Sequence, residues 1–177
     1  MSDKFFSVLI ASLLIVVAAV SRIVPHPWNF TPVIAMALFA GARLERTSWA
    51  VAGMFLVLAL GDLAIGAFPY AGLPWVYGTL LVVTLIGRRL AKEKGLIIPL
   101  AYTIGTGALF YAVTNLGVWL QGGLYSRTFD GLFTCYVAGL PFYRNQLVGD
   151  LLFSSALFGA FALASKIRIR FAGQPVH

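Results

Sequence analysis

The stretch Arg22-Ile-Val-Pro-His-Pro-Trp-Asn-Phe-Thr-Pro-Val33 interrupts a chain that is otherwise mostly hydrophobic. Its three prolines prevent a continuous helix, because proline lacks a backbone N–H and restricts the residue before it. The pair Thr31-Pro32 predicts a new helix start, with threonine as the N-cap and proline at the first helical position. We expect this helix to end before the charged Arg43.

The helix that follows, expected at Pro32–Ala42, is too short to cross a bilayer. From Thr31 to Arg43 a helix rises only about 20 Å, whereas the hydrocarbon core is about 30 Å thick. The irregular backbone at Asn29–Thr31 must then lie below the membrane surface, where it is tolerated only inside protein or beside a wet cavity. The stretch therefore predicts the wall of a pocket. The alternative is a plain loop whose short helix thins the bilayer.

The composition indicates an integral membrane protein. Of 177 residues, 60% are hydrophobic and 11% are charged, and the mean hydropathy is +0.89. Soluble domains carry roughly 25% charged residues. The length suits a single transmembrane domain over residues 1–177. There is no ATP-binding glycine loop, HExxH or paired CxxC motif, and the two histidines, His26 and His177, are too few for a catalytic metal site.

Apolar runs predict an all-α fold, a six-helix transmembrane bundle with a short second helix and an outward-facing pocket. The expected crossings are Phe5–Val20, Pro32–Ala42, Ser48–Gly66, Trp75–Leu90, Leu96–Leu120 and Pro141–Ala164. Between the last two, Gln121–Leu140 is too polar to span, and we expect a loop there with a short interfacial helix near Phe129–Val137.

Basic residues set the predicted orientation. With the N-terminus in the cytoplasm, only Arg22, Arg127 and Arg144 of the 13 lysines and arginines fall in outside segments. This asymmetry satisfies the positive-inside rule. It predicts a bacterial cytoplasmic membrane protein with both termini cytoplasmic, whose basic residues contact lipid headgroups. We expect no nucleic-acid partner.

With this orientation, most of the remaining polar residues gather in the outer half. A charge in hydrocarbon costs at least ~2.5 kcal/mol, so such residues pair or line a cavity. The expected substrate-binding residues are His26, Trp28, Asn29, Asp62, Asn115, Trp119, Arg144, Asn145 and Asp150. Helical spacing places Tyr111, Asn115 and Trp119 on one face, and Tyr143, Gln146 and Asp150 on another. Each stripe is equally compatible with a structural network that links helices.

Depth in the membrane suggests two ion pairs, joining Arg22 or Arg144 to Asp62 or Asp150. A lone ionised carboxylate at this depth is disfavoured, so we expect Asp150 to be either paired with an arginine or protonated. Arg22 is the better partner, because Arg144 lies six residues before Asp150 on nearly the opposite helix face. The surrounding aromatic residues favour an uncharged or zwitterionic, partly aromatic ligand.

Small residues recur along the last helix at Ala156, Ala160 and Ala164. This spacing lets another helix approach closely. We expect packing inside this protein. The alternative is a docking seam for a partner membrane subunit.

Several motifs carry a family resemblance: Pro25-His-Pro-Trp-Asn-Phe-Thr-Pro32, Gly61-Asp62-Leu63, Thr114-Asn-Leu-Gly-Val-Trp119, Cys135-Tyr136, Pro141-Phe-Tyr-Arg-Asn145 and Gly149-Asp150-Leu151. The chain resembles a bacterial family of small, uncharacterised six-helix membrane proteins. More distantly, its layout and size resemble the S-components of energy-coupling-factor vitamin transporters, which include solitary members that handle cobalamin.

The second resemblance implies an outward-facing pocket for a micronutrient. The first helix departs from the S-component pattern, because the AxxxA seam is absent and only Ser7 and Ala11 have that spacing. This departure argues against a shared energising module. In a cobalamin carrier, Cys135 is the only cysteine that could ligate cobalt.

Three functions follow as hypotheses. The leading one is a membrane transporter or substrate-capture subunit for a small micronutrient such as a vitamin, with no cofactor and no covalent chemistry. The second is an integral-membrane enzyme that uses Asp62 and Asp150 as acid and base, assisted by His26. The third is a structural or assembly subunit without a small ligand, whose polar residues bind helices together.

The predicted topology can be tested by cysteine labelling. A membrane-impermeant thiol reagent applied from outside should label a Ser126→Cys variant and leave a Glu45→Cys variant unlabelled, because only position 126 lies in an outside segment. The opposite pattern would invert the orientation and with it the placement of the pocket.

Overall fold

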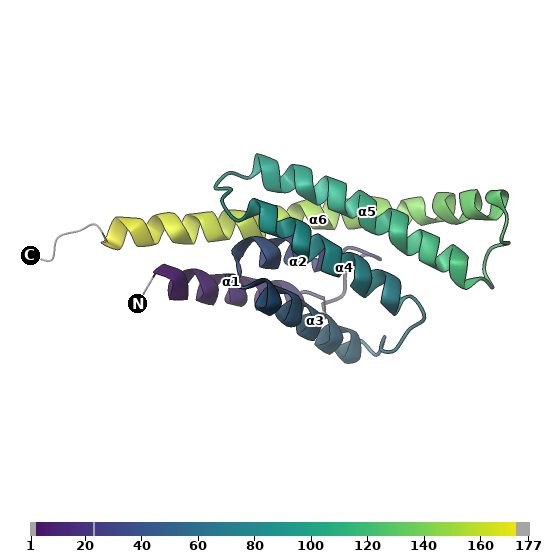
Figure 1. The fold of residues 1–177 in the computed structure, drawn as a ribbon, viewed down its shortest axis with the longest axis horizontal. Coiled ribbons are helices and arrows are strands. Elements are labelled where there is room, and N and C mark those ends of the chain that lie inside the picture. Colours follow the sequence, from purple (N-terminus) through teal and green to yellow (C-terminus); the bar gives the residue numbers. More distant parts are fainter. Residues whose placement is uncertain (1–2, 23, 173–177) are drawn as a thin grey trace, which may run out of the picture.

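The computed structural model describes residues 3–22 and 24–172, and every regular element in these residues is helical. The elements are α1 (Asp3–Val20), α2 (Val33–Arg43), α3 (Thr47–Ala64), α4 (Leu73–Gly87), the 3-10 turn η1 (Arg88–Leu90), α5 (Ile97–Gln121) and α6 (Phe129–Ala172). Successive helices run in opposite directions along an elongated bundle (Figure 1). The all-helical class and the short second helix are therefore confirmed.

Three of the described helices are long and apolar enough to cross a membrane. They are α3, α5 and α6, the last over Phe129–Arg168. Two further apolar segments, Phe5–Val20 and α2, are shorter. These helices support a membrane protein, and the number of crossings stays a prediction.

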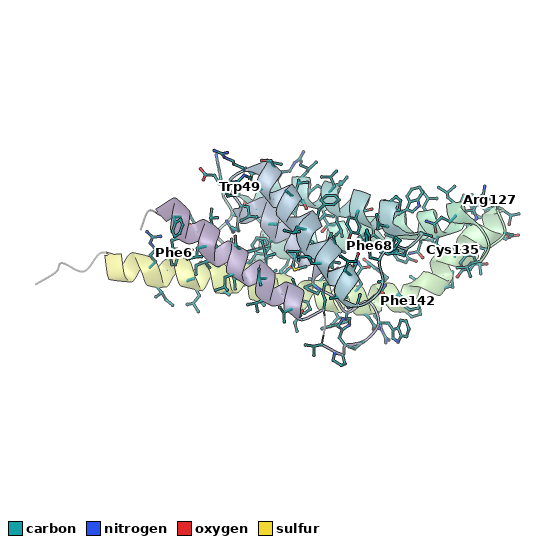
Figure 2. The ribbon with its side chains drawn as sticks, turned by 90° about the horizontal axis from the view of Figure 1, so that it is seen from below. Phe6, Trp49, Phe68, Arg127, Cys135 and Phe142 are labelled. Atoms are coloured by element: carbon teal, nitrogen blue, oxygen red, sulfur yellow. The ribbon has the colours of Figure 1, made fainter. Side chains whose placement is uncertain are left out.

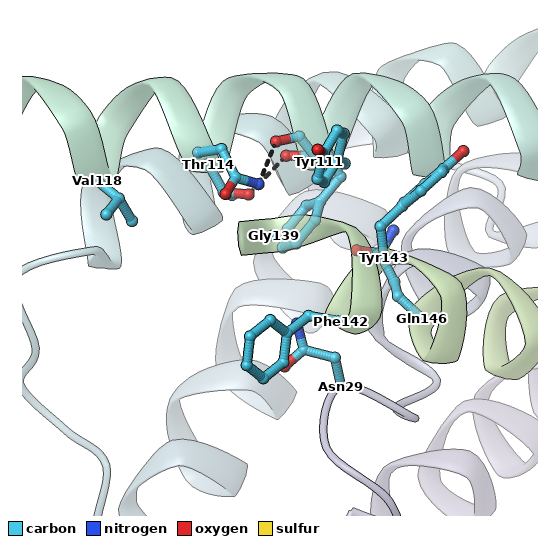
Figure 3. Close-up of a pocket in the computed structure, with 10 residues that line it drawn as sticks. Asn29, Tyr111, Thr114, Val118, Gly139, Phe142, Tyr143 and Gln146 are labelled. Atoms are coloured by element: carbon cyan, nitrogen blue, oxygen red, sulfur yellow. Dashed lines mark hydrogen bonds between the residues drawn. The ribbon is translucent and has the colours of Figure 1, made fainter. Parts of the chain in front are cut away.

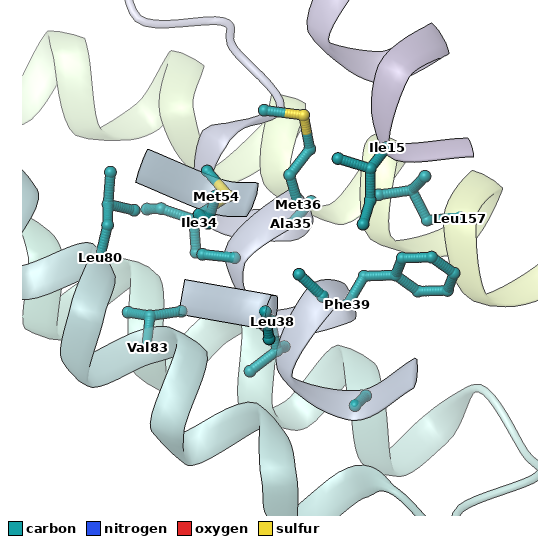
Figure 4. Packing of buried hydrophobic residues seen from close by; sticks show 14 of the residues in the cluster. Ile15, Ile34, Ala35, Met36, Leu38, Phe39, Met54, Leu80, Val83 and Leu157 are labelled. Atoms are coloured by element: carbon teal, nitrogen blue, oxygen red, sulfur yellow. The ribbon is translucent and has the colours of Figure 1, made fainter. Parts of the chain in front are cut away.

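The centre of the bundle is α2. The residues from Ile34 to Ala40 are each no more than 1% exposed. Helices α1, α3, α4, α5 and α6 all contact α2, so its apolar side chains are covered on every side (Figure 4). Phe39 meets Phe158 of α6 edge to face, with ring centroids 5.1 Å apart. A short helix that is hydrophobic all round is stable only in such a surrounded position.

The start of α2 differs slightly from the prediction. The helix begins at Val33, and Pro32 is the N-cap, whose carbonyl accepts from the Met36 N–H at 2.8 Å. No side chain caps this end, so the expected N-cap role of Thr31 is wrong.

Helices α2 and α4 touch backbone to backbone at Gly41 and Gly87. A Cβ on Gly41 would overlap the Thr84 carbonyl oxygen, and a Cβ on Gly87 would overlap the Leu38 carbonyl oxygen. Only glycine allows this approach, because any side chain would push the two helices apart.

Two arginines close the end of this contact. Arg88 donates to the carbonyls of Gly41, Leu44 and Glu45 at 3.2, 2.6 and 3.0 Å. In return, Arg43 donates to the carbonyls of Ala91 and Glu93 at 3.3 and 2.6 Å. Carbonyls at helix ends lack partners within the helix, so these bonds satisfy both chain ends reciprocally.

The last helix is longer than predicted. We expected a loop at Gln121–Leu140 and a helix from Pro141, whereas α6 runs unbroken through 44 residues with Pro141 inside it. Packing on α5 outweighs the proline: Tyr111 donates its hydroxyl to the Tyr136 carbonyl, and Tyr136 donates to the Ala112 carbonyl at 2.7 Å. Together α5 and α6 form a hairpin that extends past the other helices (Figure 1).

The alanine stripe on α6 does not pack as expected. Ala156 and Ala160 are exposed and Ala164 is half-buried. Packing inside this protein is therefore wrong for the first two, because α5 and α2 cover other faces of α6.

The close contact at Gly41 and Gly87 predicts that one added methyl group will lower the stability of the protein. Gly87→Ala should lower the free energy of unfolding by about 1–3 kcal/mol or more, because the new Cβ meets backbone that cannot move aside. Gly78→Ala, on the same helix with open space around it, should be neutral or mildly stabilising. Thermal unfolding in detergent measures both. Equal stabilities would contradict the close approach.

Candidate functional site

A cavity of about 170 Å³ lies between α5, α6 and the loop that precedes α2 (Figure 3). Its lining residues are Asn29, Phe110, Tyr111, Thr114, Asn115, Val118, Gly139, Phe142, Tyr143 and Gln146. Its walls combine four aromatic rings with three amide side chains. This cavity is the candidate site.

Helical spacing explains how the walls form. The α5 residues from Phe110 to Val118 recur at four-residue intervals, and the α6 residues Gly139, Phe142 and Gln146 recur at three and four. Each set therefore occupies one face of its helix. Gly139 provides space for the Asn115 side chain, because a Cβ at position 139 would lie 2.5 Å from the Asn115 Oδ1.

The polar atoms of the α5 wall are partly engaged. Asn115 donates its Nδ2 to the Tyr111 carbonyl at 2.8 Å, and among the described residues its Oδ1 has no hydrogen-bond partner. The Tyr111 ring packs on Tyr143 with centroids 4.7 Å apart and an interplanar angle of 32°. The wall thus offers an acceptor beside a pair of aromatic rings.

Beneath the cavity lies a buried carboxyl group. Gln146 donates from its Nε2 to the Gly107 carbonyl at 3.2 Å and to the Asp150 Oδ2 at 3.3 Å. Asp150 is completely buried, and its Oδ1 has no hydrogen-bond partner within the described chain. One turn further along α6, Ser154 and Thr103 hydrogen-bond at 2.8 Å. A column of buried polar groups therefore continues from the cavity floor between α5 and α6.

The mouth is formed by the loop before α2. Asn29 has a φ of 60°, a left-handed conformation that asparagine adopts more readily than most residues. The next residue, Phe30, packs 3.3 Å from where a Cβ on Gly149 would stand, and its ring meets Phe153. Asn145 donates to the Trp28 carbonyl at 3.2 Å. These contacts hold the loop on α6 and bring Asn29 to the cavity.

The structure brings together some of the nine expected substrate-binding residues. Asn29 and Asn115 line the cavity, Asp150 lies below it, and Asn145 anchors the loop. Trp28, His26 and Arg144 are exposed instead. Trp119 donates its indole N–H to the Ser126 carbonyl at 2.9 Å, so it closes the α5–α6 connection rather than the cavity.

Asp62 belongs to a separate cluster. Its Oδ1 pairs with Arg22 at 2.6 Å, and its Oδ2 accepts from the Tyr77 hydroxyl at 2.9 Å. The side chains of the pair are only 9% and 6% exposed. The expected Arg22–Asp150 pair is therefore wrong. Gly61 allows Arg22 to reach Asp62, because a Cβ at position 61 would overlap the Arg22 guanidinium.

Five site residues were absent from the sequence-based expectations for the cavity: Phe110, Thr114, Val118, Gly139 and Phe142. Tyr111, Tyr143 and Gln146 belong to the two predicted stripes, so spacing could have placed them here. Among the described residues no group of three His, Cys, Asp or Glu side chains could hold a metal ion, and His177 lies outside these residues. Cys135 is buried, 3.4 Å from the Asn115 carbonyl oxygen.

The Arg22–Asp62 pair should dominate the stability of its end of the bundle. Arg22→Ala leaves a buried carboxylate uncompensated and should cost about 3–5 kcal/mol, more than the Arg22→Ala/Asp62→Ala double variant. Arg144→Ala removes an exposed arginine and should change little. Thermal unfolding of all the variants in detergent, read as a double-mutant cycle, decides this. Additive losses would mean that the two ions do not interact.

Neither a curated protein nor a solved structure matches this chain significantly. The model of one protein family, described as a family of unknown function (DUF6580), matches residues 3–172. The match covers every helix that lines the cavity and the loop at its mouth. On this match, the chain belongs to the DUF6580 family of unknown function.

Proposed function

We propose that this protein is a membrane transporter or substrate-capture subunit for a small micronutrient, held in the cavity between α5, α6 and the Asn29 loop. The observation that carries the proposal is a cavity lined by amide and aromatic side chains in a largely apolar bundle. Sites for small molecules have this character, with apolar walls and a few placed polar groups.

The orientation is part of the proposal. Six crossings with both termini in the cytoplasm would place the Asn29 loop toward the outside of a bacterial cytoplasmic membrane. The alternating helix directions support this arrangement (Figures 1 and 2). So do Arg43, Arg88 and Lys166, which lie at or near the C-terminal ends of α2, α4 and α6. The cavity mouth would then face the source of an imported solute.

The volume of the cavity suits a ligand about as large as a single six-membered ring. An engineered protein cavity of about 150 Å³ holds benzene, and this one measures about 170 Å³. The Tyr111 and Tyr143 rings suit an aromatic face, and the Asn115 Oδ1 suits a ligand N–H or O–H. A corrinoid such as cobalamin exceeds this volume many times over, so we propose a smaller cargo.

Access to the cavity depends on few contacts. The Asn29 loop is held by Phe30 on Gly149 and by the Asn145–Trp28 hydrogen bond, while Trp28 itself is 80% exposed. Lifting the loop would open the mouth without disturbing α2, which is fixed by its own core. Alternate opening of this loop is the motion that we propose for solute entry.

The enzyme alternative has less support. Asp62 is already engaged by Arg22 and Tyr77, whereas Asp150 contacts Gln146, so the two carboxyl groups have different partners on different helices. One observation supports the structural alternative: the Thr103–Ser154 and Gln146–Gly107 hydrogen bonds join α5 to α6. Ligand binding distinguishes it from the transporter.

The test is ligand retention by the intact protein. Native mass spectrometry of protein extracted gently from its own membranes should show a bound small molecule, and Asn115→Leu should weaken its binding about tenfold through loss of one hydrogen bond. Gln121→Leu removes an amide from the same helix outside the cavity and should leave binding unchanged.

Two outcomes would contradict the proposal. The first is equal binding by the Asn115→Leu and Gln121→Leu variants. The second is an empty cavity in a stable hetero-complex with another membrane protein, which would favour the structural role.

A further inference from the structure

A second, larger cavity lies at the opposite end of the bundle from the Asn29 loop. It measures about 450 Å³ and is lined by residues at the end of α2, in the connection from η1 to α5 and in the last third of α6. Its lining residues are Arg43, Ala91, Lys92, Glu93, Lys94, Phe161, Ala162, Ser165 and Lys166. We refer to it as the basic cavity.

One of its four cations is fixed. Arg43 donates to the Ala91 and Glu93 carbonyls, and its guanidinium lies over the rings of Phe158 and Phe161 at 5.4 and 5.0 Å. These contacts use the arginine as part of the wall. Arg43 therefore contributes positive charge to the cavity, while its terminal nitrogens already donate to backbone carbonyls.

The other three cations are lysines, whose ammonium groups stand at the ends of flexible four-carbon side chains. Lys92, Lys94 and Lys166 are all exposed, and no salt bridge to them is found in the part of the chain that the structure describes. The single acidic side chain of the lining, Glu93, cannot balance four positive charges. The positive charges around the cavity repel one another. An anion inside it would be attracted by them and would also reduce this repulsion.

The apolar surroundings indicate what kind of anion fits. The apolar part of the cavity lining includes Phe161 and Ala162, and the neighbouring outer face of α6 exposes Leu163 and Ile167. A ligand with a charged head and an apolar tail can satisfy both surfaces. Basic pockets between membrane helices on the cytoplasmic side bind phospholipid headgroups in this manner.

We propose that the basic cavity binds a phosphate-bearing anion, supplied by an anionic phospholipid of the surrounding leaflet. Lys92, Lys94 and Lys166 hold the phosphate as point charges, and the acyl chains lie along Leu163 and Ile167. The site is independent of the solute cavity, since the two share no lining residue. Bound lipid also joins α6 to the Arg43 end of α2.

The test uses the whole protein in phosphatidylcholine nanodiscs that contain phosphatidylglycerol. Native mass spectrometry of the released protein should show preferential retention of phosphatidylglycerol. Lys94→Gln/Lys166→Gln should reduce this preference about 30-fold, because each lysine near an anionic headgroup contributes about fivefold. Arg46→Gln/Arg89→Gln removes equal charge from the same end, outside the cavity, and should retain the lipid.

A second arm distinguishes the source of the phosphate. In nanodiscs of phosphatidylcholine alone, inorganic phosphate that raises the unfolding temperature of the wild-type protein, and not of the lysine variant, would assign the site to a soluble phosphorylated ligand. Equal lipid retention by the two double variants, together with no lysine-dependent effect of phosphate, would overturn the proposal. Asn115→Leu should alter neither readout.

Discussion

Complete burial of α2 is the constraint on which the other elements depend. Its side chains from Ile34 to Ala40 have no contact with solvent, so five helices must surround it. Apolar burial of this kind contributes roughly 25 cal/mol per Å² of surface that is exposed in the unfolded chain. The two glycines at the α2–α4 crossing and the exchange of hydrogen bonds between Arg43 and Arg88 then fix its depth. The irregular loop that precedes α2 packs on α6 and brings Asn29 to the cavity.

The polar residues of the bundle separate into those that bind one another and those at the cavity or its floor. Arg22 and Asp62 form an ion pair, and Arg43 and Arg88 donate to backbone carbonyls, although the Nε atoms of Arg22 and Arg43 are buried without a partner in the described chain. Asn115 in the cavity wall and Asp150 below it each retain an oxygen without a partner among the same residues. A buried polar atom without a partner is costly, and the Asp150 Oδ1 is such an atom beneath the cavity. The family assignment adds no chemistry, and the proposed role rests on the cavity between α5, α6 and the Asn29 loop.

Much of the architecture could be predicted, because hydrophobic runs and proline chemistry act locally. The short helix after Pro32 and the placement of Asn29 beside Asn115 followed from such signals. The continuity of α6 through Pro141 could not, since it depends on tyrosine hydrogen bonds from α5. The partner of Arg22 also could not be predicted from the sequence. Depth in the membrane allowed two carboxylates, and the space left by Gly61 decided between them.

The projecting α5–α6 hairpin has a practical consequence. A helix of 44 residues rises about 66 Å, roughly twice the hydrocarbon thickness, so part of it must stand clear of the lipid. Its tip is stiffened by the Trp119–Ser126 and Arg127–Leu120 hydrogen bonds, which cross the turn. A projecting epitope is what a protein of 19.1 kDa otherwise lacks for electron cryomicroscopy. An antibody fragment raised against this tip would supply a fiducial mark whose orientation reports directly on the helices of the cavity.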